Sequence, residues 1–270
     1  MQDFFEHYFE HEGIHIKHSR SAPSMRGQEF HNYCEFVFFL GGNAKFISKN
    51  IHTKLTPGNI IFIPKNAYHQ FVIKGNDYTR CIIGFHVLDN MDSILSSIGA
   101  EPVLIESLNE TTTLILNGLL NIIRSKHTQS EKALYIYASV THLLFEIQKE
   151  SNGSINQSFN VSKNVHDALL MIDDLYRQPI TVETLAKSLR ISPSLLSHKF
   201  KKEMNISVYQ YISKKRLATA RQLIESGIPI TVAGTQCGFS DYCCFLRAYK
   251  KQYGCVPSAR HSIEPGGNTK

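Results

Sequence analysis

Two patterns of hydrophobic and polar positions divide the chain. Between residues 14 and 90 the apolar residues come in short runs of β-branched and aromatic side chains, and turn residues such as Gly, Pro and Asn separate these runs. Short runs with turn signals at this density predict the strands of a sandwich or a barrel. We expect the strands at 34–40, 45–48, 60–63, 70–73 and 79–87.

Helical spacing replaces this pattern from about residue 91 onward. Apolar residues recur every three or four positions over 112–125 and 131–149, which predicts two helices that pack on the strands. Residues 150–160 are polar and have no period, so they predict a flexible linker. The expected organisation is a domain over 1–150, a linker over 151–162 and a second domain over 163–270. The predicted apolar stripe of the two helices comprises Leu116, Leu119, Leu120, Ile123, Leu134, Tyr137, Val140, Leu144 and Ile147.

The second domain is expected to begin with an amphipathic helix at Asn164 and to contain a helix-turn-helix pattern near its start. Thr181 is the expected N-cap of the first helix of that pattern. Ser192 is the expected N-cap of the second helix, and Pro193 follows it at the first helical position. A long helix over 208–225 then leads to a second pattern of the same kind.

That second pattern runs from Ile230 to Pro257. Thr231 is the expected N-cap of its first helix, and Gly238 permits a turn at positive φ. Ser240 or Asp241 is the expected cap of its second helix. Two helix-turn-helix patterns in one chain are a much stronger signal for DNA binding than one pattern alone.

Charge separates the two halves of the chain. Residues 1–159 contain 13 Lys and Arg against 15 Asp and Glu, a net charge of −2, whereas residues 160–270 contain 16 against 8, a net charge of +8. This distribution predicts that only the second half binds a polyanion. A solvated basic surface without such a partner would have the same composition.

Within the basic half, a set of residues matches a known pattern in both order and spacing. The set comprises Leu185-Ala186, Ser192-Pro193-Ser194, Leu196-Ser197, Phe200-Lys201-Lys202, Arg216-Leu217, Ala220, Gly238-Phe239-Ser240-Asp241, Phe245, Arg247, Lys250-Lys251, Gly254 and Pro257. Over nearly 80 residues it resembles the C-terminal DNA-binding domain of AraC/XylS-type transcription regulators. Asn205 stands where that family usually has glycine, and asparagine tolerates the left-handed conformation. Ala233-Gly234 replaces the usual Ile-Ala pair and should loosen the second pattern.

The strand-rich half contains a second resemblance. It comprises His31, Glu35, Gly42, Gly58, Pro64, Asn66 and His69. This set resembles the two motifs of the cupin barrel, the usual N-terminal domain of many AraC-type regulators. The resemblance implies an α+β chain of two domains, a cupin-like β-barrel with packed helices and an all-α domain with two helix-turn-helix units joined by a long helix.

Three readings of His31, Glu35 and His69 remain open. In metal-binding cupins the matching positions hold an ion, and two histidines with a carboxylate can bind a divalent metal. The fourth ligand position is Glu29 here, however, so we expect no metal and no other cofactor. We expect the three residues to orient a small effector. Hydrogen bonding within the barrel alone is nearly as strong an alternative.

The resemblance implies a regulator, an activator by expectation, that binds double-stranded DNA and responds to a small molecule such as a sugar. Each recognition helix would enter a major groove, with the two helices about 34 Å apart. Arg247 is the best candidate for a bidentate guanine contact, and lysines suit phosphates. The expected DNA-facing residues are Ser194, Ser197, His198, Lys201, Tyr242, Cys243, Leu246, Arg247 and Lys250.

Several expectations concern partners and location. The N-terminus lacks a signal-peptide pattern and no apolar run approaches 18 residues, so we expect a cytoplasmic protein without a membrane partner. The six cysteines are expected to be reduced thiols. A homodimer through the helices that follow the barrel, and contact with RNA polymerase, are expected from the family.

Two rival functions come from other classes. The first is a metal-dependent cupin enzyme with an appended nucleic-acid-binding domain, whereas our expectation is that the chain is not an enzyme. The second is a nucleoid or RNA-binding module without effector control. The pair of helix-turn-helix patterns favours the regulator over both.

Overall fold

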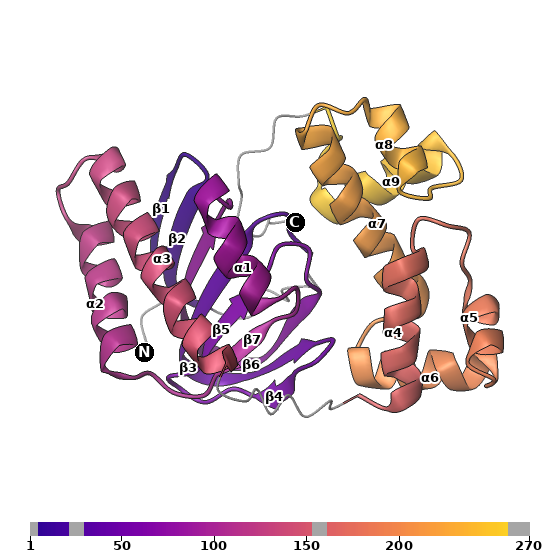
Figure 1. Cartoon of the computed structure of the whole chain (residues 1–270), viewed down its shortest axis with the longest axis horizontal. Coiled ribbons are helices and arrows are strands. Elements are labelled where there is room, and N and C mark those ends of the chain that lie inside the picture. The colour runs from indigo at the N-terminus through magenta and orange to yellow at the C-terminus, as the bar shows by residue number, and fades with distance from the viewer. Residues whose placement is uncertain (1–4, 22–29, 153–160, 259–270) are drawn as a thin grey trace. The chain divides into compact units, whose positions relative to one another are not determined.

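The computed structural model describes residues 5–21, 30–152 and 161–258. By contacts between Cα atoms the chain divides into two compact units, one holding residues 1–27 and 33–158 and the other holding residues 159–270 with the short segment 28–32. The first unit is a sheet with helices, and the second is helical (Figure 1). None of the helices in the described part of the chain is long and apolar enough to cross a membrane.

The sheet of the first unit has seven strands in the order β1-β2-β6-β3-β5-β7, and β4 pairs with β3 outside this path. It is an open sheet, so the expected closed barrel is wrong. The strands are antiparallel wherever they pair. Their bounds are β1 Phe5–His11, β2 Ile14–Ser21, β3 Cys34–Ser48, β4 His52–Lys54, β5 Ile60–Ile63, β6 His69–Phe85 and β7 Val103–Ile105.

Strands β3 and β6 are each longer than the sequence indicates. The glycine pair at Gly41 and Gly42, predicted to be a turn, lies inside β3, where the register with β6 shifts between Phe39 and Asn43. Gly42 has φ of 101°, and a Cβ there would lie 2.8 Å from the Tyr78 Cα atom. Glycine therefore bends a continuous strand through a β-bulge at this position instead of ending it.

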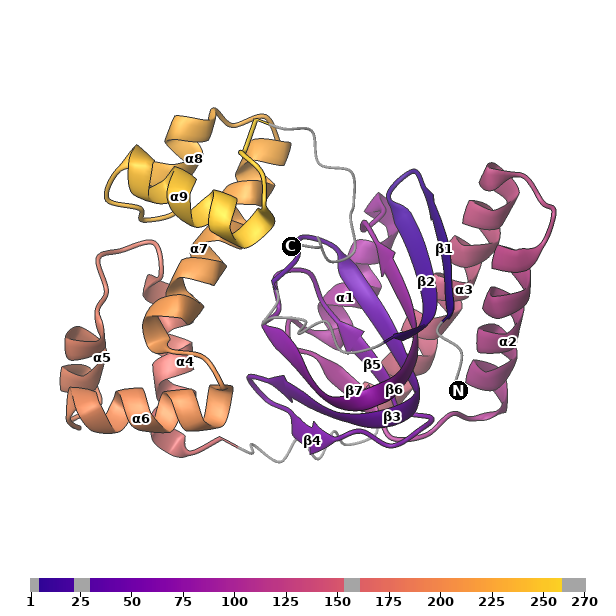
Figure 2. The same cartoon turned by 180° about the vertical axis from the view of Figure 1, so that it is seen from behind.

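Helices cover one face of the sheet, as both views of the chain show (Figure 1 and Figure 2). Side chains of β2, β3, β5 and β6 on this face pack with α1, α2 and α3 in one apolar cluster that includes Ile16, Phe36 and Leu144. The opposite face, called the inner face below, has its own cluster with members such as Val37, Ile61 and Ile82. The helices are η1 Asp89–Met91, α1 Asp92–Ile98, α2 Glu110–Arg124 and α3 Gln129–Asn152.

The predicted apolar stripe of α3 is correct except at its first position. Tyr137 packs against the cluster beneath α3, and Val140 is fully buried. Leu134, however, is 73 % exposed, because Ala133 and Ile136 occupy the buried face instead. Helix α3 also continues to Asn152, past the predicted start of the linker, and most of that predicted linker lies outside the described residues.

The second unit contains the two predicted helix-turn-helix motifs. The first comprises α5 and α6, the second comprises α8 and α9, and α7 runs between them (Figure 1). Helix α4 packs against α6 ahead of the connecting helix. The bounds are α4 Lys163–Leu175, α5 Val182–Ser188, α6 Pro193–Met204, α7 Val208–Glu225, α8 Ile230–Gln236 and α9 Tyr242–Tyr253.

Local capping fixes most of these helix ends. Thr181 and Ser192 accept backbone hydrogen bonds at the starts of α5 and α6, and Asp241 does so at the start of α9. Asn205 ends α6 in the left-handed conformation, as expected for the residue that replaces glycine. The prediction of Thr231 as a cap is wrong, because α8 already begins at Ile230 after Pro229 and has no side-chain cap.

Candidate DNA-binding surface and effector site

Helix α6 presents a polar face to solvent. Leu196 and Phe200 are fully buried and hold the helix on the unit's core. The four predicted DNA-facing residues of this helix, Ser194, Ser197, His198 and Lys201, are all exposed. Because the apolar and polar residues occupy different sides, the helix can remain packed while its outer side contacts another molecule.

Helix α9 repeats this arrangement with one difference. Phe245 and Tyr249 are fully buried, whereas Cys243, Arg247 and Lys250 are exposed and Tyr242 is 44 % exposed. Leu246, which was predicted to face DNA, is half-buried and packs against the apolar cluster around Phe245. The outer side of α9 is therefore more polar and more basic than the sequence predicts.

The guanidinium group of Arg247 is anchored to its own helix. Its Nη2 donates to the sulfur of Cys244 at 3.4 Å, which holds the side chain along the first turn of α9. Cys244 in turn donates its backbone N–H to the carboxylate of Asp241 at 2.7 Å. Backbone and side-chain donors of Cys244 lower the pKa of Asp241, so the cap is ionised near neutral pH.

The two motifs are connected through α4 and α7. Helix α7 has 18 residues, which corresponds to roughly 27 Å at 1.5 Å per residue. Arg216 of α7 donates through Nε to the carbonyl oxygen of Tyr176 at 2.5 Å, and Lys215 lies 2.6 Å from Asp173. Burial lowers the pKa of Arg216, although a guanidinium remains charged. These contacts fix the end of α4 against the connecting helix.

The turn of the second motif also packs against this junction. Gly238 has φ of +86°, and a Cβ at this position would lie 2.5 Å from the carbonyl oxygen of Arg177. Any other residue would therefore strain the backbone and collide with the chain after α4. Neighbouring Cys237 is buried in the apolar cluster that contains Phe245 and Tyr249. Burial raises the pKa of its thiol to about 11.

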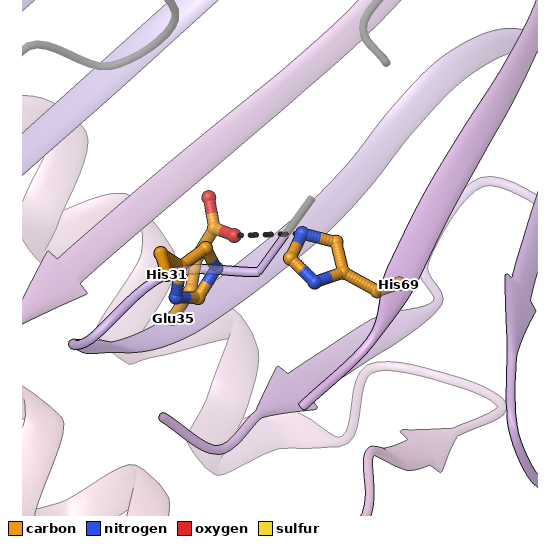
Figure 3. Close-up of side chains that lie close together, drawn as sticks. All are labelled: His31, Glu35 and His69. Atoms are coloured by element: carbon orange, nitrogen blue, oxygen red, sulfur yellow. Dashed lines mark ion pairs between the residues drawn. The ribbon is translucent and has the colours of Figure 1, made fainter. Parts of the chain in front are cut away.

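The structure brings His31 together with Glu35 and His69 of the sheet unit. A possible ligand atom from each lies within 4.8 Å of the others (Figure 3). Glu35 belongs to β3 and is 5 % exposed, and His69 begins β6 and is 1 % exposed. Nε2 of His69 lies 3.8 Å from Oε2 of Glu35, the pair joined by the dashed line in Figure 3.

Hydrogen bonding orients the His69 ring. Its Nδ1 lies 3.2 Å from the carbonyl oxygen of Ala67, which can only accept, so this geometry assigns the Nδ1 proton to that bond. When the ring is neutral, Nε2 carries the lone pair and is turned toward Glu35. The same atom can accept a hydrogen bond from a ligand or coordinate an ion.

The residue types of this cluster suit a divalent ion, but their donor atoms are farther apart than the ligands of one bound ion would be. Two imidazoles and one carboxylate are common ligands of zinc and of iron. Donors on one tetrahedral ion with bonds of 2.0–2.2 Å would lie about 3.4 Å apart, whereas the donor atoms here are separated by up to 4.8 Å. His31, Glu35 and His69 would be the residues to hold an ion, after a small contraction of the cluster.

Sequence reasoning missed the other polar residues of the inner face. His15, Lys17 and Ser19 alternate along β2 with the apolar residues that face the helices. Arg80 stands between Tyr78 and Ile82 of β6, which both belong to the inner cluster. The alternation of apolar Ile14 and Ile16 with polar residues is visible in the sequence and would have indicated this polar face. The sequence alone, however, does not show that β2 pairs with β6.

Family models match both units of the chain. A model described as an AraC-like ligand binding domain matches residues 17–144, and a helix-turn-helix domain model matches residues 185–260. The Msm operon regulatory protein of Streptococcus mutans is 32% identical over 266 residues, covering 91% of each chain. The arabinose operon regulatory protein of Salmonella typhimurium is 31% identical over 121 residues, covering 43% of each chain. Among solved structures, an apo ToxT variant from Vibrio cholerae aligns over 93% of this chain and 97% of its own, with a TM-score of 0.44 and 14% identity.

A sheet unit with a ligand-binding family signature and a helical unit with two helix-turn-helix motifs define a DNA-binding transcription regulator. Similarity to the Streptococcus mutans regulator over nearly the whole chain makes the assignment more specific. The chain belongs to the AraC family of transcription regulators.

Proposed function

We propose that this protein is a sequence-specific regulator whose affinity for operator DNA is set by a small molecule bound to the sheet unit. The observation that carries the proposal is the pair of helix-turn-helix motifs in one unit, each with an exposed polar helix face. The 18-residue α7 separates the motifs by a length comparable to one turn of duplex, roughly 34 Å. Helices α6 and α9 then enter successive major grooves on one side of the DNA.

The residues of the two helices divide by role. Arg247 reads a guanine through its paired N–H donors, while Lys201 and Lys250 contact phosphates. Ser197 and His198 of α6 contact base edges in the neighbouring groove. The remaining predicted contacts, from Ser194, Tyr242 and Cys243, complete the two exposed faces, and half-buried Leu246 supports α9 from beneath.

The effector site is formed by Glu35 and His69 on the inner face of the sheet, together with His31. Buried carboxylate and imidazole groups orient a polar ligand by hydrogen bonds. One relative is named for the arabinose operon, so sugars and sugar derivatives are the first class of effector to test. The protein acts as an activator that contacts RNA polymerase, in the compartment that contains the genome, the cytoplasm of a bacterial cell.

The experiment measures binding of the full-length protein to DNA upstream of its own and neighbouring genes, with and without a panel of sugars. Specific binding that one sugar or sugar derivative changes is the expected result. The Glu35→Ala variant should bind the same DNA but lose the response. Equal affinity for all sequences, without any small-molecule effect, would instead indicate a nucleic-acid-binding module without effector control.

The protein is proposed to act as a homodimer through α2 and α3. Leu134 and Phe145 of α3 are 73 % and 51 % exposed and stand eleven positions apart, so they lie on nearly the same side of the helix. Leu114 of α2 is 65 % exposed. Sedimentation of Leu134→Glu should show a monomer, whereas Leu170→Glu, at an exposed apolar position of α4, should leave the dimer intact.

A metal-dependent cupin enzyme is the second candidate function. It is favoured by one observation, the grouping of two histidines and a carboxylate. It requires stoichiometric metal in the purified protein and loss of that metal in His69→Ala. Metal-free protein with full DNA binding and effector response would leave the regulator as the only candidate.

A further inference from the structure

The helix-covered face of the sheet bears a group of basic side chains at the end of α2. His7 of β1 and His18 of β2 are directly opposite each other in the strand register. Both lie on this face, because His18 is two positions from Ile16, which packs beneath the helices. Arg124, the last residue of α2, donates through Nη2 to Nδ1 of His18 at 3.4 Å. Residues of three elements thus meet on the side of the sheet opposite to Glu35.

The contact with Arg124 fixes the proton of the His18 ring. A guanidinium can only donate, so Nδ1 of His18 accepts and the ring proton is on Nε2. His18 is 7 % exposed, and its burial, together with the basic neighbours Arg124 and His7, lowers its pKa to about 4. The ring is therefore neutral near pH 7. Its Nε2–H donor has no acceptor among the described residues.

Arg20 adds a second guanidinium on the same face, two positions after His18 in β2. It is opposite Phe5 of β1, whose ring centre lies 4.7 Å from that of His18 and 5.8 Å from that of His7. The Nε atom of Arg20 is buried and has no hydrogen-bond partner within the described residues. A buried N–H group without a partner costs free energy and is rare in native structures. A bound acceptor would remove this cost.

Acidic partners are missing from this group in the described part of the chain. Arg20 and Arg124 form no ion pair there with a carboxylate. Glu6 precedes His7 in β1, but its side chain lies on the inner face and pairs with Lys17 at 2.7 Å. Basic groups that lie close together without acidic neighbours repel one another, and an anion bound among them relieves this repulsion. A bound anion would therefore supply the missing opposite charge.

The number of donors indicates which anion fits. A guanidinium presents paired N–H donors to an oxyanion, and Nε2–H of His18 adds a donor from a separate group. A carboxylate has two oxygens and a single charge. A phosphate monoester has three terminal oxygens and a charge of about −1.5 to −2 near neutral pH. Two guanidinium groups and an imidazole N–H therefore match a phosphate better than a carboxylate.

We propose that this group binds a phosphate group, held by the guanidinium groups of Arg124 and Arg20 and by Nε2–H of His18. The ligand is either free phosphate or the phosphate ester of a small metabolite. This site goes beyond the proposed function, because it lies on the other face of the sheet from Glu35 and His69 and takes a second ligand. Bound phosphate connects the end of α2 to β2 and so stabilises the sheet unit.

Calorimetry on the full-length protein tests the site with inorganic phosphate and with glucose 6-phosphate at constant ionic strength. At least one of them should bind saturably, and the tighter of the two shows whether the ligand is free phosphate or a phosphate ester. Arg124→Gln should weaken this binding by about 10- to 100-fold, the range for hydrogen bonds to a charged group. Lys126→Gln, an exposed basic position just after α2, is the matched control and should leave the affinity unchanged.

Two further variants separate the paired donors from charge alone and cover the case in which Arg124→Gln is unstable. Arg124→Lys keeps the charge but loses the paired donors, so its phosphate affinity should lie between those of wild type and Arg124→Gln. Arg20→Gln should weaken binding as well, and phosphate should raise the unfolding temperature of wild type more than that of either glutamine variant. Absence of saturable binding, or equal losses in Arg124→Gln and Lys126→Gln, would overturn the proposal.

Discussion

The two helix-turn-helix motifs have the same outline but are stabilised in different ways. In the first, Thr181 and Ser192 cap both helices, and Asn205 ends α6. In the second, α8 has no side-chain cap and contains a glycine at Gly234. The first motif is thus specified largely by local signals, whereas the second depends on tertiary packing.

Gly234 illustrates the difference. Glycine in a helix costs about 1 kcal/mol relative to alanine, so the sequence predicts a loosened helix. The structure gives the reason for the glycine, since a Cβ at this position would lie 3.0 Å from the ring of Phe245. Packing of α9 closely against α8 compensates for the low intrinsic helix stability of α8.

The largest effect is expected at the turn of the second motif. Gly238→Ala should destabilise this motif by about 3–5 kcal/mol, because it combines a left-handed backbone with a collision at Arg177. The control is Gly227→Ala, where φ is +91° but no atom of the described residues lies within 4 Å of the added Cβ, so about 1–2 kcal/mol is expected. Hydrogen exchange of α8 and α9 in the full chain measures both. Equal effects in the two variants would show that the contact with Arg177 is unimportant.

Arg247→Ala should weaken binding to the cognate operator by about 1–3 kcal/mol and relax specificity at one base pair. Lys250→Ala is the matched variant on the same helix and should weaken all sequences equally, with a lower salt dependence. Fluorescence anisotropy on the operator and on single-base variants distinguishes the two. A uniform loss in Arg247→Ala would make this residue a phosphate contact.

The first motif should lose stability when one of its helix-capping residues is removed. Ser192→Ala removes the hydroxyl that accepts from the Leu195 N–H at 3.2 Å and should cost about 1 kcal/mol. Hydrogen exchange should increase in α6 and remain unchanged in α9. If α9 exchanged faster as well, the two motifs would form one cooperative unit instead of two with separate determinants.

The smallest expected effect is a pH dependence of stability, which distinguishes the Asp241 cap of α9 from the Ser192 cap of α6. Ser192 does not titrate, whereas the pKa of Asp241 is held below its ordinary value of about 4 by the donors of Cys244. Since the folded-state pKa is the lower one, the carboxylate stabilises α9 above about pH 4, and this contribution is lost as the pH falls through the folded-state pKa. Thermal unfolding of wild type and Asp241→Asn should differ near neutral pH and converge in acid. A constant difference across this range would contradict the role of the carboxylate.

The helical unit was predicted from sequence in nearly all its parts, because caps, glycines and apolar spacing act locally. Thr231 was assigned wrongly because α8 starts one residue before it, after a proline. The sheet unit was predicted less completely. Gly41 and Gly42 indicate a turn in sequence but form a bulge, and the open edge strands β1 and β7 have few distinguishing signals.

The candidate sites show the same limit. Glu35 and His69 were found through their resemblance to a motif, and the exposed residues of α6 and α9 through helical spacing. Leu246 is more buried than helical spacing indicates, because a residue at the edge of an apolar stripe can lie on either side. Ser19 and Arg80 were missed because 60 intervening residues separate them, and only strand register places them opposite each other.

Hydroxyl-radical footprinting of the full-length protein on its operator tests the central claim most directly. Two protected segments should appear about one helical turn apart on the same side of the duplex, roughly 34 Å from centre to centre. Gly238→Ala should remove the segment bound by α9 and retain the one bound by α6. A single protected segment in the wild type, or protection without sequence preference, would contradict the account.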